Sequence, residues 1–218
     1  MLIYTWCQWI WEKDTDYKIC GNFDAITKLI KQANFDRQPV YEYNQAKEYE
    51  TRNWCTIFSW ITELSYLKNR EFTIEEIKEI WNQMINDRKL NPDKWAYLHD
   101  AIDYIRHFWN ANNPDKIESY RIDYTDTELL NILTHKNVRL TQLWYYTSRE
   151  LHTETEDNWY ANLDKYPIWW GHAVSMYGYN IIDNYKWVRK CNRYSFDKFD
   201  ELIKNWVIMK YWYLFLNY

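Results

Sequence analysis

Two residues, Cys55 and His172, carry side chains that could act together in nucleophilic chemistry. Apolar residues recur at three- and four-residue steps between Trp54 and Leu67, which predicts a helix over about Cys55 to Lys68. Cys55 then lies in the first turn, where the partial positive charge of the helix N-terminus stabilises a thiolate. The cysteine is therefore a candidate nucleophile. On position alone, a buried structural cysteine is the commoner case.

The histidine lies in an unusual segment, because Gly171 to Tyr179 holds two of the three glycines of the chain. A chain that otherwise avoids glycine needs it where backbones approach closely. His172 lies in a predicted strand at this place and is a candidate general base. The alternative is a core histidine whose hydrogen bonds are satisfied.

The sequences Cys55-Thr56-Ile57-Phe58-Ser59 and His172-Ala173-Val174, the latter followed by Gly178-Tyr179, resemble the papain family of cysteine peptidases. In that family a Cys followed by Phe-Ser opens the central helix, and a His-Ala-Val strand that ends in Gly-Tyr supplies the base. The resemblance covers Gln45 to Tyr194 in matching order. It implies a cleft between two lobes, with the cysteine on one wall and the histidine on the other.

The family also uses a glutamine upstream of the cysteine as an oxyanion-hole donor. Here Pro39-Val40-Tyr41-Glu42-Tyr43-Asn44-Gln45 resembles its context, and Gln45 is the matching residue. The spacing to Cys55 is longer than in the family, and the backbone N–H of Cys55 is a second possible donor.

The third member of the site should be an asparagine that orients the imidazole, but the family's Asn-Ser-Trp-Gly sequence is absent. An Asn/Asp-rich run at 180–184 predicts a hairpin turn, and a turn centred there places Asn192 opposite His172. Asn192 is therefore the expected residue. Asn184 and Asp183 remain alternatives within the turn.

The resemblance implies acyl transfer without a cofactor, on a peptide or protein substrate. His172 holds Cys55 as thiolate, the thiolate attacks a carbonyl, and water resolves the thioester. Gln45 and a backbone amide hold the oxyanion, and Asn192 fixes the imidazole ring. The main alternative is a catalytically inactive papain-fold protein with a binding or structural role.

The elements that must position these residues change character along the chain. We expect further helices with a 3.6-residue period, over about 74–85 behind a Thr73/Glu76 capping box, 94–109 and 126–137. We expect strands with a period of two at 138–146, 168–179, 185–191 and 207–216. The expected fold is α+β and papain-like in one domain, 1–218, with a helical lobe over 1–137 followed by an antiparallel β lobe over 138–218.

Composition excludes several other classes. A net charge of -4 without a clustered basic surface argues against nucleic acid, and the longest apolar stretches are too short to span a bilayer. Four dispersed cysteines with no CxxC pair predict reduced thiols in a cytoplasm. With so little glycine and none of the family's disulfides, the chain resembles a bacteriophage-type relative in a host cytoplasm or virion.

Two weaker patterns remain. His99, Asp103 and His107 would share one face of a helix, but no fourth ligand is indicated and we expect no metal site. The 15 Trp and 21 Tyr would suit a surface that stacks sugars or peptides. Their helical and strand spacing predicts that most are core residues.

Overall fold

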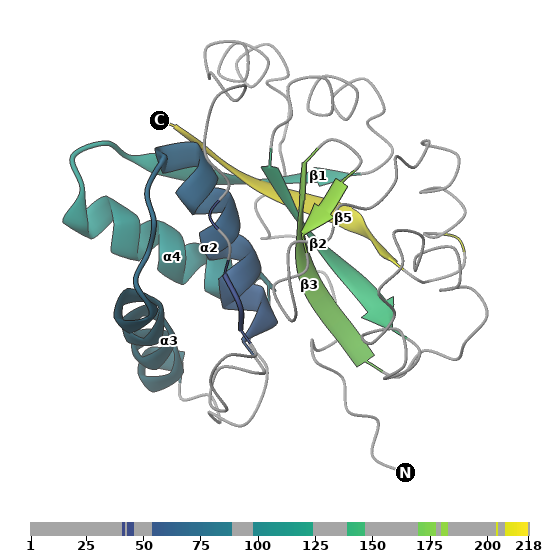
Figure 1. The fold of residues 1–218 in the computed structure, drawn as a ribbon, viewed down its shortest axis with the longest axis horizontal. Helices are drawn as coiled ribbons and strands as arrows, with labels where there is room; N and C mark the ends of the chain where they lie inside the picture. Colours follow the sequence, from purple (N-terminus) through teal and green to yellow (C-terminus); the bar gives the residue numbers. More distant parts are fainter. Residues whose placement is uncertain are drawn as a thin grey trace.

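The computed structural model describes residues 41, 43–45, 54–88, 98–123, 139–146, 170–177, 180–182, 204 and 208–217. The helices within them are α2 (Cys55–Lys68), α3 (Ile74–Arg88) and α4 (Leu98–Asn112). The strands within them are β1 (Ile117–Asp123), β2 (Arg139–Tyr146), β3 (Trp170–Tyr177), β4 (Asn180–Ile182) and β5 (Ile208–Asn217). Figure 1 shows the three helices on one side of the sheet.

Helix α2 begins at Cys55 and ends at Lys68, so the predicted bounds are confirmed. Asn69 ends it in the left-handed conformation, with φ of 49°. The N–H of Asn69 donates to Tyr66 O, and the N–H of Arg70 donates to Ser65 O, as in a Schellman motif. Every residue from Cys55 to Leu67 is buried, because α2 carries apolar side chains on most of its circumference.

Helix α3 begins with the expected capping box. Glu76 N–H donates to Thr73 Oγ1 at 3.2 Å, and Thr73 N–H donates to Glu76 Oε2 at 2.9 Å. Its apolar stripe is buried through Ile77, Ile80 and Met84. The N–H groups of Thr73 and Glu76 thus both have side-chain acceptors, which fixes the place where the helix begins.

Helix α4 ends at Asn112, three residues beyond its predicted end; residues 94–97 lie outside the described part. Asn110 ties it to β1, because its Nδ2 donates to Ile117 O at 2.9 Å and its Oδ1 accepts from Ile117 N at 2.8 Å. This pair of bonds fixes the first residue of β1 against the last turns of α4.

The described strands form one antiparallel sheet in the order β1-β5-β2-β3-β4. Helix α2 packs against β2, β3 and β5; α4 packs against α2 and β1; α3 packs against the other two helices. Helix α2 is therefore the layer between the sheet and α3, and it carries the candidate nucleophile to the sheet.

Strand β1 was not predicted, and it falls within the stretch expected to be mainly helical. It pairs along its full length with β5, so the sheet uses residues from both sides of position 137. The expected helix at 126–137 and the expected strand at 185–191 lie outside the described residues. The papain-like architecture stays a prediction.

No helix in the described ranges combines the length and apolar character needed to cross a membrane.

Candidate active site

Cys55 is the first residue of α2, and an aromatic pair fixes the residue before it. Trp54 stacks on Trp81 of α3 with ring centroids 4.6 Å apart, and its carbonyl accepts from Phe58 N–H at 3.0 Å. No acidic residue lies in the first turn of α2. The positive end of the helix is therefore not offset by a nearby carboxylate on that turn, which is the setting expected for a nucleophilic cysteine.

The thiol itself is enclosed. Cys55 is 0% exposed, and its Sγ lies 4.0 Å from Thr56 Oγ1. A thiol at this position meets a reagent or substrate only after a local movement of the surrounding chain.

His172 is the third residue of β3 and is 1% exposed. Ala173, Val174 and Ser175 are buried as well, so both faces of β3 are covered here. Because α2 packs against β3, the helix that begins with Cys55 and the strand that carries His172 lie against one another. In the described part of the chain no hydrogen bond joins Cys55 to His172.

Gln45 is fully buried, and the residue two positions before it anchors the segment to α2. The Tyr43 ring meets Phe58 edge-on at 6.4 Å. The Tyr43 hydroxyl lies 2.6 Å from Ser65 Oγ and accepts from Phe72 N–H at 2.8 Å. Two residues of extended chain span only ~7 Å, so Gln45 lies within about that distance of Tyr43, whose side chain contacts α2 at Phe58 and Ser65.

Burial also acts on Tyr43 itself. Loss of solvent around its hydroxyl raises its pKa above the ordinary value of 10.0, and the hydrogen bonds to Phe72 and Ser65 offset part of that rise. The hydroxyl is therefore neutral at physiological pH and able to serve as donor and acceptor at once.

The hairpin expected to place Asn192 is different in the structure, and the register argument for that residue was wrong. Asn180–Ile182 is strand β4 rather than a turn, and Tyr177 pairs with Asn180 across only two intervening residues. Ser175 pairs with Ile182, so β4 runs towards the position opposite His172, and three more residues of the same ladder would reach position 185. Asn192, Asn184 and Asp183 lie outside the described residues.

Sequence reasoning missed a buried polar row on the sheet-facing side of α2. Thr56, Ser59 and Glu63 are all at most 2% exposed, and their spacing of three and four residues places them on one face. Ser59 Oγ donates to Thr56 O at 3.0 Å, and a Glu63 carboxylate oxygen accepts from the N–H of Phe215 in β5. The available signal was this spacing, because Thr56, Ser59 and Glu63 recur at three- and four-residue steps within the predicted helix.

Of the three residues expected to share one face of α4, the structure describes the side chains of Asp103 and His107. His107 is exposed and its Nδ1 lies 2.8 Å from Asp103 O, while Asp103 Oδ1 pairs with Arg106 at 3.4 Å. Among the residues that the structure describes, no three His, Cys, Asp or Glu side chains gather as metal ligands. The helical face alone does not supply a coordination geometry.

Comparison with known proteins adds no relative: no family model, no curated protein and no solved structure matches this chain.

Proposed function

We propose that the chain is a cysteine-dependent peptidase or a related amide hydrolase. The observation that supports it best is the placement of Cys55 as the first residue of α2, packed against the strand that carries His172. A helix N-terminus favours the thiolate, and an imidazole from a facing strand is the base that acyl transfer requires.

In the proposed mechanism His172 takes the proton of the Cys55 thiol, and the thiolate attacks the carbonyl carbon of a peptide or amide bond. The oxyanion is held by the side-chain amide of Gln45 and by the backbone N–H of Cys55. Both are neutral hydrogen-bond donors that need no reorganisation when the negative charge develops. The imidazolium returns its proton to the leaving amine. Water then attacks the thioester, with the imidazole again as base, and frees Cys55.

The proposed site needs a third residue that orients His172. Strand β4 ends at Ile182 while running towards the position opposite His172, and Asp183 and Asn184 are the next two residues of the chain. They are therefore favoured over Asn192, which comes eight residues later than Asn184. A carboxylate or an amide oxygen can each accept from an imidazole N–H.

A second function is supported by a specific observation. Cys55, His172 and Gln45 are exposed by 0%, 1% and 0%, so the structure holds all three away from solvent. This favours a catalytically inactive protein that keeps the residues as core and acts in binding or as a structural component. In either case a reducing compartment, the cytoplasm of a cell or of a phage host, would keep the free Cys55 reduced.

The rate of Cys55 alkylation by iodoacetamide, followed across pH 4 to 10 by peptide mass spectrometry, separates the two functions. An ordinary thiol becomes reactive near pH 8.5. An enzyme should show rapid alkylation of Cys55 well below that pH, and His172→Ala should remove the low-pH reaction. His107→Ala is the matched control, because His107 is exposed on α4 and should leave the profile unchanged.

The same assay in urea completes the test. If native Cys55 does not react at any pH but reacts once the chain unfolds, the thiol is a core residue and the peptidase proposal fails. If it reacts at low pH in the native protein, hydrolysis of a peptide library, compared with Cys55→Ser, then defines the substrate.

A further inference from the structure

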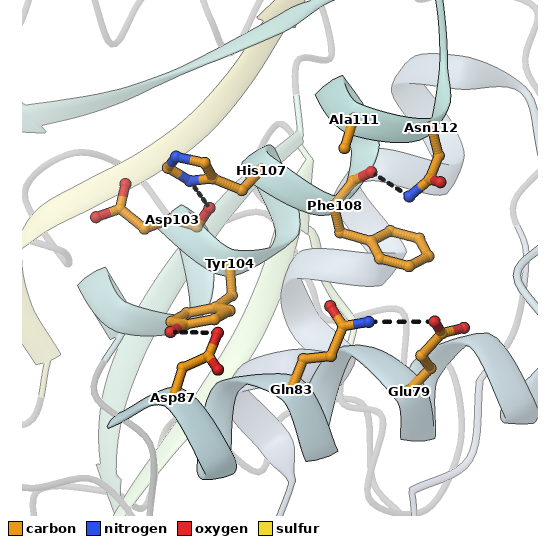
Figure 2. A pocket seen from close by; sticks show the side chains of 9 residues that line it. All are labelled: Glu79, Gln83, Asp87, Asp103, Tyr104, His107, Phe108, Ala111 and Asn112. Atoms are coloured by element: carbon orange, nitrogen blue, oxygen red, sulfur yellow. Dashed lines mark hydrogen bonds between the residues drawn. The ribbon is translucent and has the colours of Figure 1, made fainter. Parts of the chain in front are cut away.

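A groove of about 500 Å³ lies between α3 and α4, apart from the proposed active site. Its α3 wall carries Glu79, Gln83 and Asp87, which are exposed and recur at every fourth residue. Figure 2 shows the rings of Tyr104 and Phe108 directed from α4 into the space in front of that wall. The groove thus has a polar wall and a partly aromatic floor.

The groove is open because the apolar stripes of α3 and α4 point into the core and not into the groove. On α3, Ile80 and Met84 enter the core, which leaves the row that contains Gln83 on the outer face. On α4, Ile105 and Trp109 are buried in the same way. Their outward neighbours Tyr104 and Phe108 are only half-buried, so part of their ring surface is left available.

The charge of the groove is of one sign. Its lining includes the carboxylates of Glu79, Asp87 and Asp103, and no Lys or Arg is among the lining residues. Asp103 shares Arg106 with Glu118. Within the described part of the chain neither Glu79 nor Asp87 forms an ion pair.

Neutral donors hold the two carboxylates of α3 in place. Gln83 Nε2 donates to Glu79 Oε1 at 3.1 Å, and the Tyr104 hydroxyl donates to Asp87 Oδ2 at 3.2 Å (Figure 2). These bonds orient the carboxylates without cancelling their charge, so the groove presents fixed negative groups beside ring faces.

We propose that this groove is a docking site for a Lys- and Arg-rich segment of a partner protein. A lysine or arginine offers a cationic head to the carboxylates and an aliphatic stem to the rings of Tyr104 and Phe108, and a cation over a ring face adds attraction. The eight-residue step from Glu79 to Asp87 spans ~12 Å of helix, which matches about four residues of an extended segment. Charge complementarity thus selects a basic occupant over an acidic or purely apolar one.

Fluorescence anisotropy with a fluorescein-labelled eight-residue peptide of lysines around one central leucine tests the proposal on the full chain. We expect saturable binding that weakens with added salt, since the charges are exposed. Glu79→Gln with Asp87→Asn should weaken it about fivefold, the effect of losing two exposed ion pairs. The matched control is Glu71→Gln with Glu75→Gln, which removes the same net charge from two exposed positions outside the groove and should change affinity less than twofold.

Three outcomes would overturn the proposal. Equal weakening by the two double variants would show that only net charge matters. Binding of a peptide with glutamates in place of the lysines would remove the charge argument. Binding of spermine without binding of the lysine peptide would show a small-cation site rather than a protein-docking groove.

Discussion

Glu63 of α2 accepts a hydrogen bond from the backbone N–H of Phe215 in β5, across 152 positions of the sequence. Both residues are 1% exposed, and the Phe215 ring also packs on Trp60 of the same helix with centroids 5.0 Å apart. A single residue of β5 is therefore held to α2 through its backbone and its ring. Because β5 lies between β1 and β2, this contact joins the helix that begins at Cys55 to the interior of the sheet.

Glu63→Ala should destabilise the protein by about 1–3 kcal/mol, because the buried N–H of Phe215 loses its acceptor. Glu63→Gln keeps an acceptor oxygen and should cost less. The free energy of unfolding in urea, followed by tryptophan fluorescence, measures both. Equal losses in the two variants would mean that the hydrogen bond contributes nothing and that only side-chain packing matters.

Tyr43→Phe should cost about 1–3 kcal/mol at pH 7, since it leaves the N–H of Phe72 buried without its acceptor. Tyr41→Phe is the matched control, because Tyr41 is half-buried, and it should change stability by less than about 0.5 kcal/mol. The measurement is again urea unfolding. A loss in the control as large as that in Tyr43→Phe would contradict the role of the hydrogen bond.

The difference in stability between the wild type and Tyr43→Phe should shrink at alkaline pH. Burial raises the pKa of Tyr43, so the unfolded chain loses this proton at lower pH than the folded protein does. The contribution of the hydroxyl is full below about pH 10 and declines as pH rises through the folded pKa. Urea unfolding of both proteins from pH 8 upwards measures it, and a difference that grows with pH would have the wrong sign.

Thr73→Ala should lower stability by about 0.5–2 kcal/mol, because the N–H of Glu76 loses the oxygen that caps α3. Thr73→Ser retains the hydroxyl and should recover most of the loss. Thermal unfolding followed by circular dichroism compares the three proteins. The capping interpretation fails if the serine variant is as unstable as the alanine variant.

If the peptidase proposal holds, the residue that orients His172 can be found with the alkylation assay. We expect Asp183→Ala or Asn184→Ala to reduce the low-pH reactivity of Cys55, and Asn192→Ala to leave it intact, since β4 is already paired with β3 at Ile182. Loss of reactivity only in Asn192→Ala would instead restore the residue expected from the sequence.

The sequence was most informative where one signal dominates. The bounds of α2 follow from its apolar spacing, and the start of α3 follows from Thr73 and Glu76, whose side chains satisfy the local backbone. These are local interactions, so neighbouring residues suffice to predict them. Cys55 and His172 were placed on the expected kinds of element for the same reason.

Long-range pairing was less predictable. Strand β1 forms by pairing with β5, which lies about 90 residues later in the sequence. Without knowledge of that pairing, the seven residues of β1 look like the end of the helical region that precedes them. The hairpin was misplaced because Asn and Asp also suit strand ends, whereas the connection between Tyr177 and Asn180 is only Gly178 and Tyr179. Glycine favours such two-residue connections, so Gly178 was the sequence signal for a turn at 178–179 instead of 180–184.

The strand order has a consequence for how the chain is made. Strand β1 ends at Asp123, and the first residue of β5 that pairs with it is Tyr211, so 88 positions must be synthesised before β1 can pair. At ~5–20 residues per second, translation leaves β1 unpaired for about 4–18 s. During that interval its unpaired edge is a site at which nascent chains on one messenger could associate. Helix α4, already bonded to Ile117 through Asn110, is the contact available to protect one end of β1 until β5 emerges from the ribosome.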